Sequence, residues 1–276
     1  MKINHLPQND ITNGWSKILR SREPHGALET DINADWLVIG GGYAGLAAAR
    51  RLAEHRPDEK IVLVEAGICG DNTSGRNSGF AIDIPHNTSS NLDELEGAHG
   101  HMRLARAAVD HLEHQVKTYG IDCDWSRNGK YQAAVTPEGS AAMLDPFAAE
   151  LEKLEEPYEW VEADQLAKRL GTNHFYRAVY TPGCILMNPA ALTRSLVDSL
   201  PDNVTIFENT PVTAIDYING VSVDTPGGSI RAPRMILAAN GFSKHFGFLQ
   251  SKFFHIAAHA SLTRRLTEEE QRAYGV

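Results

Sequence analysis

The segment from Trp36 to Gly67, WLVIGGGYAGLAAARRLAEHRPDEKIVLVEAG, constrains the fold of this chain more than any other. A short apolar run ends at Gly40, an alanine-rich stretch with helical character follows, and a second apolar run, KIVLVEAG, closes the segment. Runs that are apolar on both faces suit buried strands of a parallel sheet that helices cover. The segment therefore predicts a strand–helix–strand unit inside an α/β domain.

Three glycines, Gly40, Gly42 and Gly45, stand with the spacing G-x-G-x-x-G where the first strand turns into the helix. In a dinucleotide-binding turn the first makes the tight turn, the second lets the backbone approach a pyrophosphate, and the third lets helix and strand pack closely. Glu65 ends the second strand, where a carboxylate accepts hydrogen bonds from ribose hydroxyls. The helix N-terminus adds amide donors for phosphates. The pattern predicts a dinucleotide site, disfavours a 2′-phosphate, and leaves NAD and FAD open.

Charge and composition exclude several other classes. The net charge is −9, from 26 basic and 35 acidic residues, and nucleic-acid binding needs clustered Lys and Arg. The three cysteines lie far apart without a C-x-x-C pair, so neither a disulfide framework nor a zinc site is supported. His111 and His114 fall on a predicted solvated helix face, so we expect no metal. No apolar run has transmembrane or signal-peptide length, and we expect a cytoplasmic protein.

The pattern of apolar residues predicts two domains, each built from two chain segments. An N-terminal extension covers residues 1–34, a nucleotide-binding domain residues 35–120 and 188–249, and an inserted substrate domain residues 121–187 and 250–276. The first domain alternates apolar runs with helical stretches. The second contains charged helices and short strand-like runs.

Local signals add detail to this division. Asn188 followed by Pro189 predicts the start of a helix. Asn128 with Gly129 predicts the turn of a hairpin in IDCDWSRNGKYQAAV, and residues 251–266 alternate loosely like a strand of the inserted domain.

Four motifs, in this order along the chain, resemble the FAD-dependent D-amino-acid oxidase (glycine/sarcosine oxidase-like) superfamily. They are the unit at 35–67, SGRNSGF at 74–80, ENTPVTAID at 208–216 and RMILAANGFS at 234–243. The SGRNSGF loop looks closest to the γ-glutamylputrescine oxidase-like branch. The resemblance implies an α/β protein: a Rossmann-like FAD-binding domain with a parallel sheet, plus an inserted, incomplete mixed-sheet substrate domain. Members of the superfamily continue well past the point corresponding to Val276, so we expect a C-terminally truncated chain.

The resemblance also assigns cofactor-binding residues. Those expected to hold the FAD pyrophosphate are Gly40, Gly42, Tyr43, Ala44 and Gly45. Those expected to hold the adenosine are Glu65 and Ala66 at the ribose and Val212 at the adenine. Those expected to run past the pyrophosphate toward the flavin ring are Ser74, Gly75, Arg76, Asn77 and Ser78. Those expected to close over the dinucleotide are Ala239, Asn240 and Gly241.

Arg76 and Asn77 are the candidate catalytic residues. Both lie in the long polar loop from Gly70 to Asn87, and loops of that length are usually functional or disordered. Their side chains supply donors for an anionic or reduced flavin. A solvated surface arginine and ordinary loop chemistry are the alternatives. His86, His255 and His259 are weaker candidates for facing the substrate, and each is more often an ordinary strand or loop histidine.

The resemblance implies an enzyme that oxidises the C–N bond of an amine or amino acid to an imine, by hydride transfer to a non-covalent flavin. The alternative is a catalytically silent FAD- or nucleotide-binding fragment or subunit that needs another chain or a C-terminal segment. An NAD-linked dehydrogenase is disfavoured by the SGRNSGF loop and the late LAANG run. The expected partner is a small-molecule amine or amino-acid substrate, and homo-oligomers or a completing chain stay open.

Overall fold

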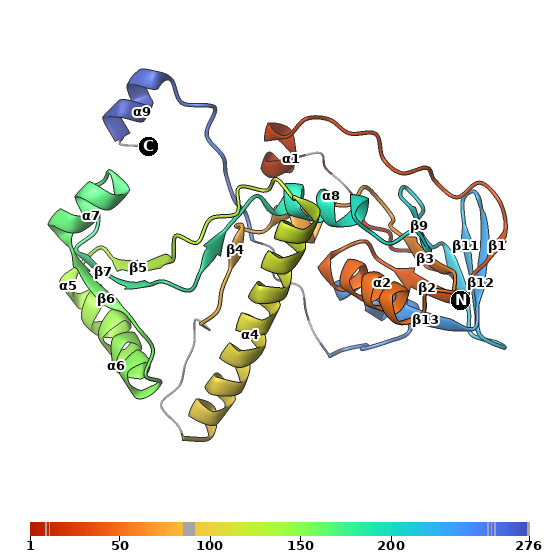
Figure 1. The fold of residues 1–276 in the computed structure, drawn as a ribbon, viewed down its shortest axis with the longest axis horizontal. Helices are drawn as coiled ribbons and strands as arrows, with labels where there is room; N and C mark the ends of the chain where they lie inside the picture. Colours follow the sequence, from red (N-terminus) through yellow and green to blue (C-terminus); the bar gives the residue numbers. More distant parts are fainter. Residues whose placement is uncertain are drawn as a thin grey trace. The chain divides into compact units, whose positions relative to one another are not determined.

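The computed structural model describes residues 1–8, 10, 12–84, 92–252, 254, 256 and 258–274 (Figure 1). The chain divides into two compact units. Unit 1 comprises Met1–Ser78, Tyr119–Cys123 and Asn188–Ala260, and unit 2 comprises Gly79–Thr118, Asp124–Met187 and Ser261–Val276. Residues 1–34 thus group with unit 1, and residues 79–118, expected in the nucleotide-binding domain, group with unit 2. The functional domain boundaries stay a prediction.

A parallel four-stranded sheet lies in unit 1 (Figure 1). Its strands, in spatial order, are β13 (Arg234–Leu237), β2 (Trp36–Ile39), β3 (Ile61–Val64) and β9 (Val204–Phe207). Helix α2 (Tyr43–His55) connects β2 to β3 and packs against the sheet. All four residues of β3 are buried, as expected for a strand covered on both faces. The predicted parallel sheet and its strand–helix–strand unit are confirmed.

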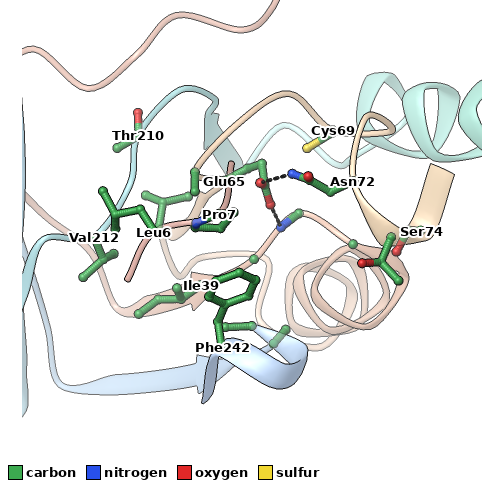
Figure 2. A pocket seen from close by; sticks show the side chains of 18 of the residues that line it. Leu6, Pro7, Ile39, Glu65, Cys69, Asn72, Ser74, Thr210, Val212 and Phe242 are labelled. Carbon is green, nitrogen blue, oxygen red and sulfur yellow. Dashed lines mark hydrogen bonds between the residues drawn. The ribbon is translucent and has the colours of Figure 1, made fainter. Parts of the chain in front are cut away.

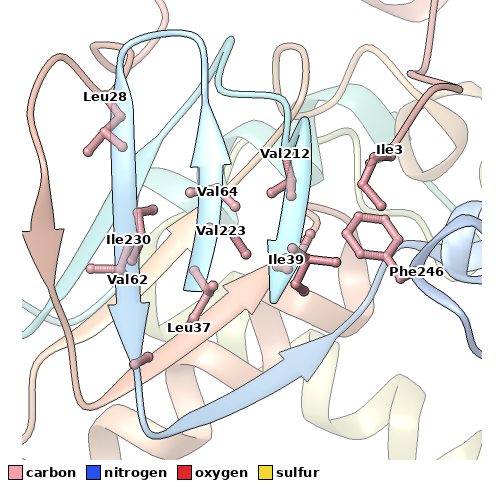
Figure 3. Close-up of a cluster of buried hydrophobic side chains, with 12 residues drawn as sticks. Ile3, Leu28, Leu37, Ile39, Val62, Val64, Val212, Val223, Ile230 and Phe246 are labelled. Carbon is pink, nitrogen blue, oxygen red and sulfur yellow. The ribbon is translucent and has the colours of Figure 1, made fainter. Parts of the chain in front are cut away.

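A second sheet in unit 1 contributes side chains to the same hydrophobic core as the parallel sheet. Its antiparallel strands β12 (Gly228–Ala232), β11 (Val221–Thr225) and β10 (Ala214–Asp216) form a meander, and the short strand β1 (Ile32–Asn33) joins β12 in parallel. Apolar side chains from both sheets, from the N-terminal region and from segments next to them pack together (Figure 3). They include Ile3, Leu28, Leu37, Ile39, Val62, Val64, Val212, Val223, Ile230 and Phe246. This core supports the strand ends that carry the site.

Short helices complete unit 1. They are α1 (Gly14–Ile18), α3 (Thr73–Arg76), α8 (Pro189–Asp198) and the 3₁₀ helix η2 (Asn240–Phe246). Helix α8 begins as predicted: the Asn188 side chain accepts hydrogen bonds from the amides of Ala190 and Ala191, at 3.1 and 3.0 Å. Pro189 occupies the first turn, where its missing N–H costs nothing.

Unit 2 contains a three-stranded sheet and several helices. Its strands, in spatial order, are β5 (Lys130–Ala134), β7 (Arg177–Thr181) and β6 (Glu159–Glu162), and a separate pair is formed by β4 (Phe80–Ala81) and β8 (Ile185–Leu186). Its helices are α4 (Leu92–Tyr119, with its last residue in unit 1), α5 (Pro137–Gly139), the π-helical η1 (Ser140–Leu144), α6 (Asp145–Lys153), α7 (Ala163–Leu170) and α9 (Glu268–Tyr274). The described strand pairs of this unit are all antiparallel, where the sequence predicted a mixed sheet.

Two local predictions in the inserted region are wrong. The hairpin around Asn128 and Gly129 does not form, because Ser126 pairs with Leu186 and Lys130 pairs with Thr181. Both flanks of the turn thus find partners in a distant segment. In addition, the described residues of 251–266 form no strand.

No helix among the described residues has the length and apolar character needed to cross a membrane.

Candidate functional site

A pocket in unit 1 lies at the carboxyl ends of three parallel strands (Figure 2). It encloses about 910 Å³ of empty space, part of which is open to solvent. Gly40–Gly42 follow β2, Glu65 and Ala66 follow β3, and Ala238 and Ala239 follow β13, and all of them line the pocket. Open α/β sheets bind ligands at this edge, because the strand ends and the following helix N-termini converge there.

Gly40 and Gly45 shape the turn between β2 and α2. Gly40 has a φ of +110°, which side-chain-bearing residues rarely adopt, and a Cβ there would lie 2.5 Å from the carbonyl oxygen of Ala238. A Cβ on Gly45 would lie 1.8 Å from the carbonyl oxygen of Gly40. Helix α2 therefore begins in direct backbone contact with the turn. This geometry fits the roles that the sequence assigned to the first and third glycines.

Glu65 is held rigidly in the pocket wall. Only 9% of the residue is exposed. One carboxylate oxygen accepts a hydrogen bond from the Gly41 amide at 2.8 Å, and the other accepts one from the Asn72 side chain at 3.4 Å (Figure 2). The second oxygen also accepts from the Gly67 amide at 3.0 Å. A carboxylate has about four acceptor positions, so capacity remains for a ligand hydroxyl. The fixed orientation means that such a hydroxyl would be bound without reordering the side chain.

The N-terminus of α2 faces the pocket through its N-cap residue. Gly42 is its N-cap residue, and the amide of Tyr43 donates to the hydroxyl of Ser74 at 3.1 Å. Gly42 and Ser74 both line the pocket. The positive end of the helix dipole favours negative charge at this position.

The N-terminal region holds the loop that begins at Gly70 through hydrogen bonds to its backbone. The buried Asn13 side chain donates to the carbonyl oxygens of Gly70 at 2.9 Å and Gly75 at 3.1 Å. The Trp15 indole donates to the carbonyl oxygen of Asn77 at 2.9 Å. Residues 1–34 carry no sustained periodicity, so the sequence gave no signal for this function.

Arg76 and Asn77 do not line the described pocket. The Arg76 guanidinium donates to the Asp10 carboxylate at 2.7 Å and to the Asp71 carbonyl oxygen at 2.6 Å. Hydrogen bonds from Thr12 and from Arg76 hold the pKa of the Asp10 carboxyl well below its usual range. The Asn77 side chain donates to the carbonyl oxygen of Ser74 at 2.7 Å. A flavin-facing role for these two residues stays a prediction.

The other expected site residues divide into two sets. Those that line the pocket are Gly40, Gly42, Glu65, Ala66, Ser74, Val212 and Ala239. Those outside its lining, besides Arg76 and Asn77, are Tyr43, Ala44, Gly45, Gly75, Ser78, Asn240 and Gly241. His86 and His255 lie outside the described residues, and the exposed His259 does not line the pocket. Sequence reasoning missed several lining residues: Ile3, His5, Leu6, Pro7, Cys69, Thr210, Phe242 and Phe246.

The chemistry of the lining favours binding over nucleophilic catalysis. Burial, together with the nearby carboxylates of Glu65 and Glu208, raises the pKa of the Cys69 thiol, so this thiol stays protonated. Within the described part of the chain, no group of three or more His, Cys, Asp or Glu side chains is placed to hold a metal ion. Backbone donors at a helix N-terminus beside a fixed carboxylate suit a nucleotide with a free ribose.

Comparison with known proteins identifies a family and several relatives. Residues 35–275 match the DAO family, described as FAD dependent oxidoreductase. Gamma-glutamylputrescine oxidoreductase of Escherichia coli (strain K12) is 26% identical over 268 residues, which are 91% of this chain and 59% of that protein. A probable oxidoreductase OrdL of Haemophilus influenzae is 27% identical over 221 residues, which are 76% of this chain and 49% of that protein. The chain therefore spans between about half and three-fifths of the length of these relatives.

Solved structures show the same fold. Glycine oxidase from Geobacillus kaustophilus superimposes with a TM-score of 0.66 at 24% identity, covering 78% of this chain and 57% of that one. L-proline dehydrogenase from P. horikoshii superimposes with a TM-score of 0.60 at 16% identity, covering 80% of this chain and 55% of that one.

Proposed function

The chain belongs to the DAO family of FAD-dependent oxidoreductases, and we propose that the pocket of unit 1 binds the adenosine diphosphate half of a non-covalent FAD. The observation that carries this proposal is the convergence of a glycine turn, a helix N-terminus and a buried carboxylate at one sheet edge. Each element matches one part of the ligand: backbone amides suit the pyrophosphate, and Glu65 suits the ribose.

The proposed contacts follow the pocket wall. The Gly40–Gly45 turn, including Tyr43 and Ala44 in the first turn of α2, holds the pyrophosphate, with the Ser74 hydroxyl beside it. Glu65 and Ala66 hold the ribose. Val212 lies in the same wall, 5% exposed, and contacts the adenine. Ala239, followed by Asn240 and Gly241, closes the site from the end of β13.

We further propose that the whole protein oxidises the C–N bond of a small amine or amino acid. Bound FAD supplies the acceptor for a hydride equivalent. The residues after Ser74 in the same loop, Gly75 to Ser78, extend toward the reacting end of the cofactor, with Arg76 and Asn77 as its polar contacts. The names of the relatives support this substrate class: one acts on gamma-glutamylputrescine, and structural neighbours are glycine oxidase and L-proline dehydrogenase.

Anaerobic mixing with candidate substrates tests the activity. The FAD-loaded chain is mixed with gamma-glutamylputrescine, glycine, proline and a set of primary amines, and the visible flavin absorption is followed. Bleaching by at least one of them is expected. Retained flavin that no amine or amino acid bleaches would instead support the alternative of a nucleotide-binding chain that is silent by itself.

Replacing Glu65 by alanine is expected to weaken FAD binding about ten- to a hundredfold. Hydrogen bonds to a charged partner contribute about 1.5–3 kcal/mol, and each 1.4 kcal/mol corresponds to a factor of ten in affinity. Flavin fluorescence titration measures the change. Glu138→Ala, an exposed carboxylate in α5 of unit 2, is the control and should bind FAD like the unchanged chain. Equal FAD affinities for the two variants would mean that Glu65 does not contact the nucleotide.

A further inference from the structure

The first three residues of the chain extend the antiparallel sheet of unit 1. The N-terminal ammonium donates to the carbonyl oxygen of Ile215 at 2.6 Å, and the Ile215 amide donates back to Met1 at 2.8 Å. The Ile3 amide donates to the carbonyl oxygen of Thr213 at 2.8 Å. The side chain of Ile3 is 6% exposed and belongs to the core. The start of the chain is therefore fixed to the edge of β10, next to the pocket.

From this anchor the chain continues along the pocket. His5, Leu6 and Pro7 all line it. Figure 2 shows Leu6 and Pro7 between Val212 and Glu65. A residue before proline prefers an extended backbone, so Leu6 and Pro7 suit a segment that runs straight along a wall. The rings of His5 and His245, 4.6 Å apart, connect the segment to η2 on the same side of the site.

We propose that residues 1–7 form the outer wall of the adenosine subsite, with Leu6 and Pro7 as the apolar surface against the adenine and ribose. This inference rests on the proposed function, which assigns the adenine to Val212 and the ribose to Glu65. An adenine ring has two apolar faces. Ile39, Val64 and Val212 offer one apolar surface of the pocket, and the N-terminal segment offers another.

The exposure of Leu6 and the chemistry of Pro7 agree with this assignment. Leu6 is 39% exposed although it lies in a pocket wall, so a ligand seated there would cover apolar surface that is otherwise hydrated. Proline has no N–H, so Pro7 places no backbone donor against the apolar face of the base. Glu65, the carboxylate in the same wall, is already oriented by the Gly41 and Gly67 amides.

Binding of FAD and of ADP to Leu6→Ser tests the proposal. ADP carries only the adenosine diphosphate half, so both ligands should lose the same factor, about tenfold, which corresponds to about 1.4 kcal/mol. The control is Ile18→Ser, a 66% exposed apolar residue in α1 of the same N-terminal region and outside the pocket. Flavin fluorescence gives the FAD affinity, competition gives the ADP affinity, and circular dichroism in urea verifies that both variants fold.

Three results would overturn the proposal. Unchanged affinities in Leu6→Ser would mean that the segment is not part of the site. Tighter binding of both ligands would mean that the segment competes with the nucleotide rather than contacting it. A loss for FAD but not for ADP would place Leu6 at the flavin half. If the unchanged chain binds neither ligand, the proposed function itself fails, and this outcome is distinct from the other three.

Discussion

Gly45→Ala is expected to destabilise unit 1 by about 3 kcal/mol or more and to abolish FAD binding. The added methyl group would lie 1.8 Å from the carbonyl oxygen of Gly40. That turn has little room to move, because Gly40 already lies against the end of β13. A Cβ added at Gly40 would lie 2.5 Å from the Ala238 carbonyl oxygen. Forcing atoms into a packed site costs about 1–3 kcal/mol, occasionally more, and here backbone must move rather than a flexible side chain. Moving α2 would also displace the amides proposed for the pyrophosphate.

Urea denaturation and FAD titration measure the two parts of this prediction. Gly97→Ala is the matched control, because Gly97 lies in helix α4 and a Cβ there has no neighbour within 4 Å. That control is expected to stabilise its helix by about 0.5–1 kcal/mol. A Gly45→Ala variant that unfolds at the same urea concentration as the unchanged chain and still binds FAD would refute the importance of the close contact.

Glu208→Ala is expected to cost about 3–5 kcal/mol of stability, because it leaves a largely buried arginine without its partner. Glu208 is 0% exposed and accepts hydrogen bonds from Arg22 at 2.9 Å and from the amides of Cys69 and His25, both at 2.6 Å. The matched control is Glu159→Ala, which breaks an exposed pair with Arg169 that also has two hydrogen bonds. An exposed pair contributes about 0–1 kcal/mol. Similar losses in the two variants would contradict the account.

The same pair predicts a dependence on pH. Burial alone would raise the pKa of Glu208, but hydrogen bonds from Arg22, Cys69 and His25 outweigh it and hold this pKa below the ordinary value of 4.5. A carboxyl group with a depressed folded-state pKa stabilises the fold above its unfolded pKa, and this contribution is lost as the pH falls through the folded value. The stability difference between the unchanged chain and Glu208→Ala should therefore shrink below about pH 4.5. A constant difference in acid would contradict the pairing.

The glycine turn and Glu65 could be predicted because they depend on residues that are close together in the sequence. Residues 36–67 form strand, glycine turn, helix and strand from their own periodicity, and Glu65 follows directly as the end of β3. Asn188 and Pro189 start a helix for an equally local reason. These features depend on residues within one or two turns of each other, and a sequence shows such neighbours directly.

Features that depend on distant partners were not predictable in the same way. Arg22 donates to Glu208, which is 186 residues away in the sequence, and Asn13 donates to Gly70, which is 57 residues away. Asn128 and Gly129 are residues typical of a hairpin turn, but such a local signal does not say which strands pair. The neighbouring strand β5 pairs with β7 instead. The N-terminal wall of the pocket belongs to the same class, because nothing in residues 1–7 indicates which sheet edge they join.

Titration of the folded chain with FAD, followed by competition with ADP, tests the central claim most directly. The account predicts saturable binding of one FAD per chain, a flavin spectrum that survives gel filtration, and displacement of the flavin by ADP, since both ligands share the pocket of unit 1. A folded chain that retains no flavin, or whose bound flavin ADP does not displace, would contradict the assignment of this pocket to the adenosine diphosphate half of FAD.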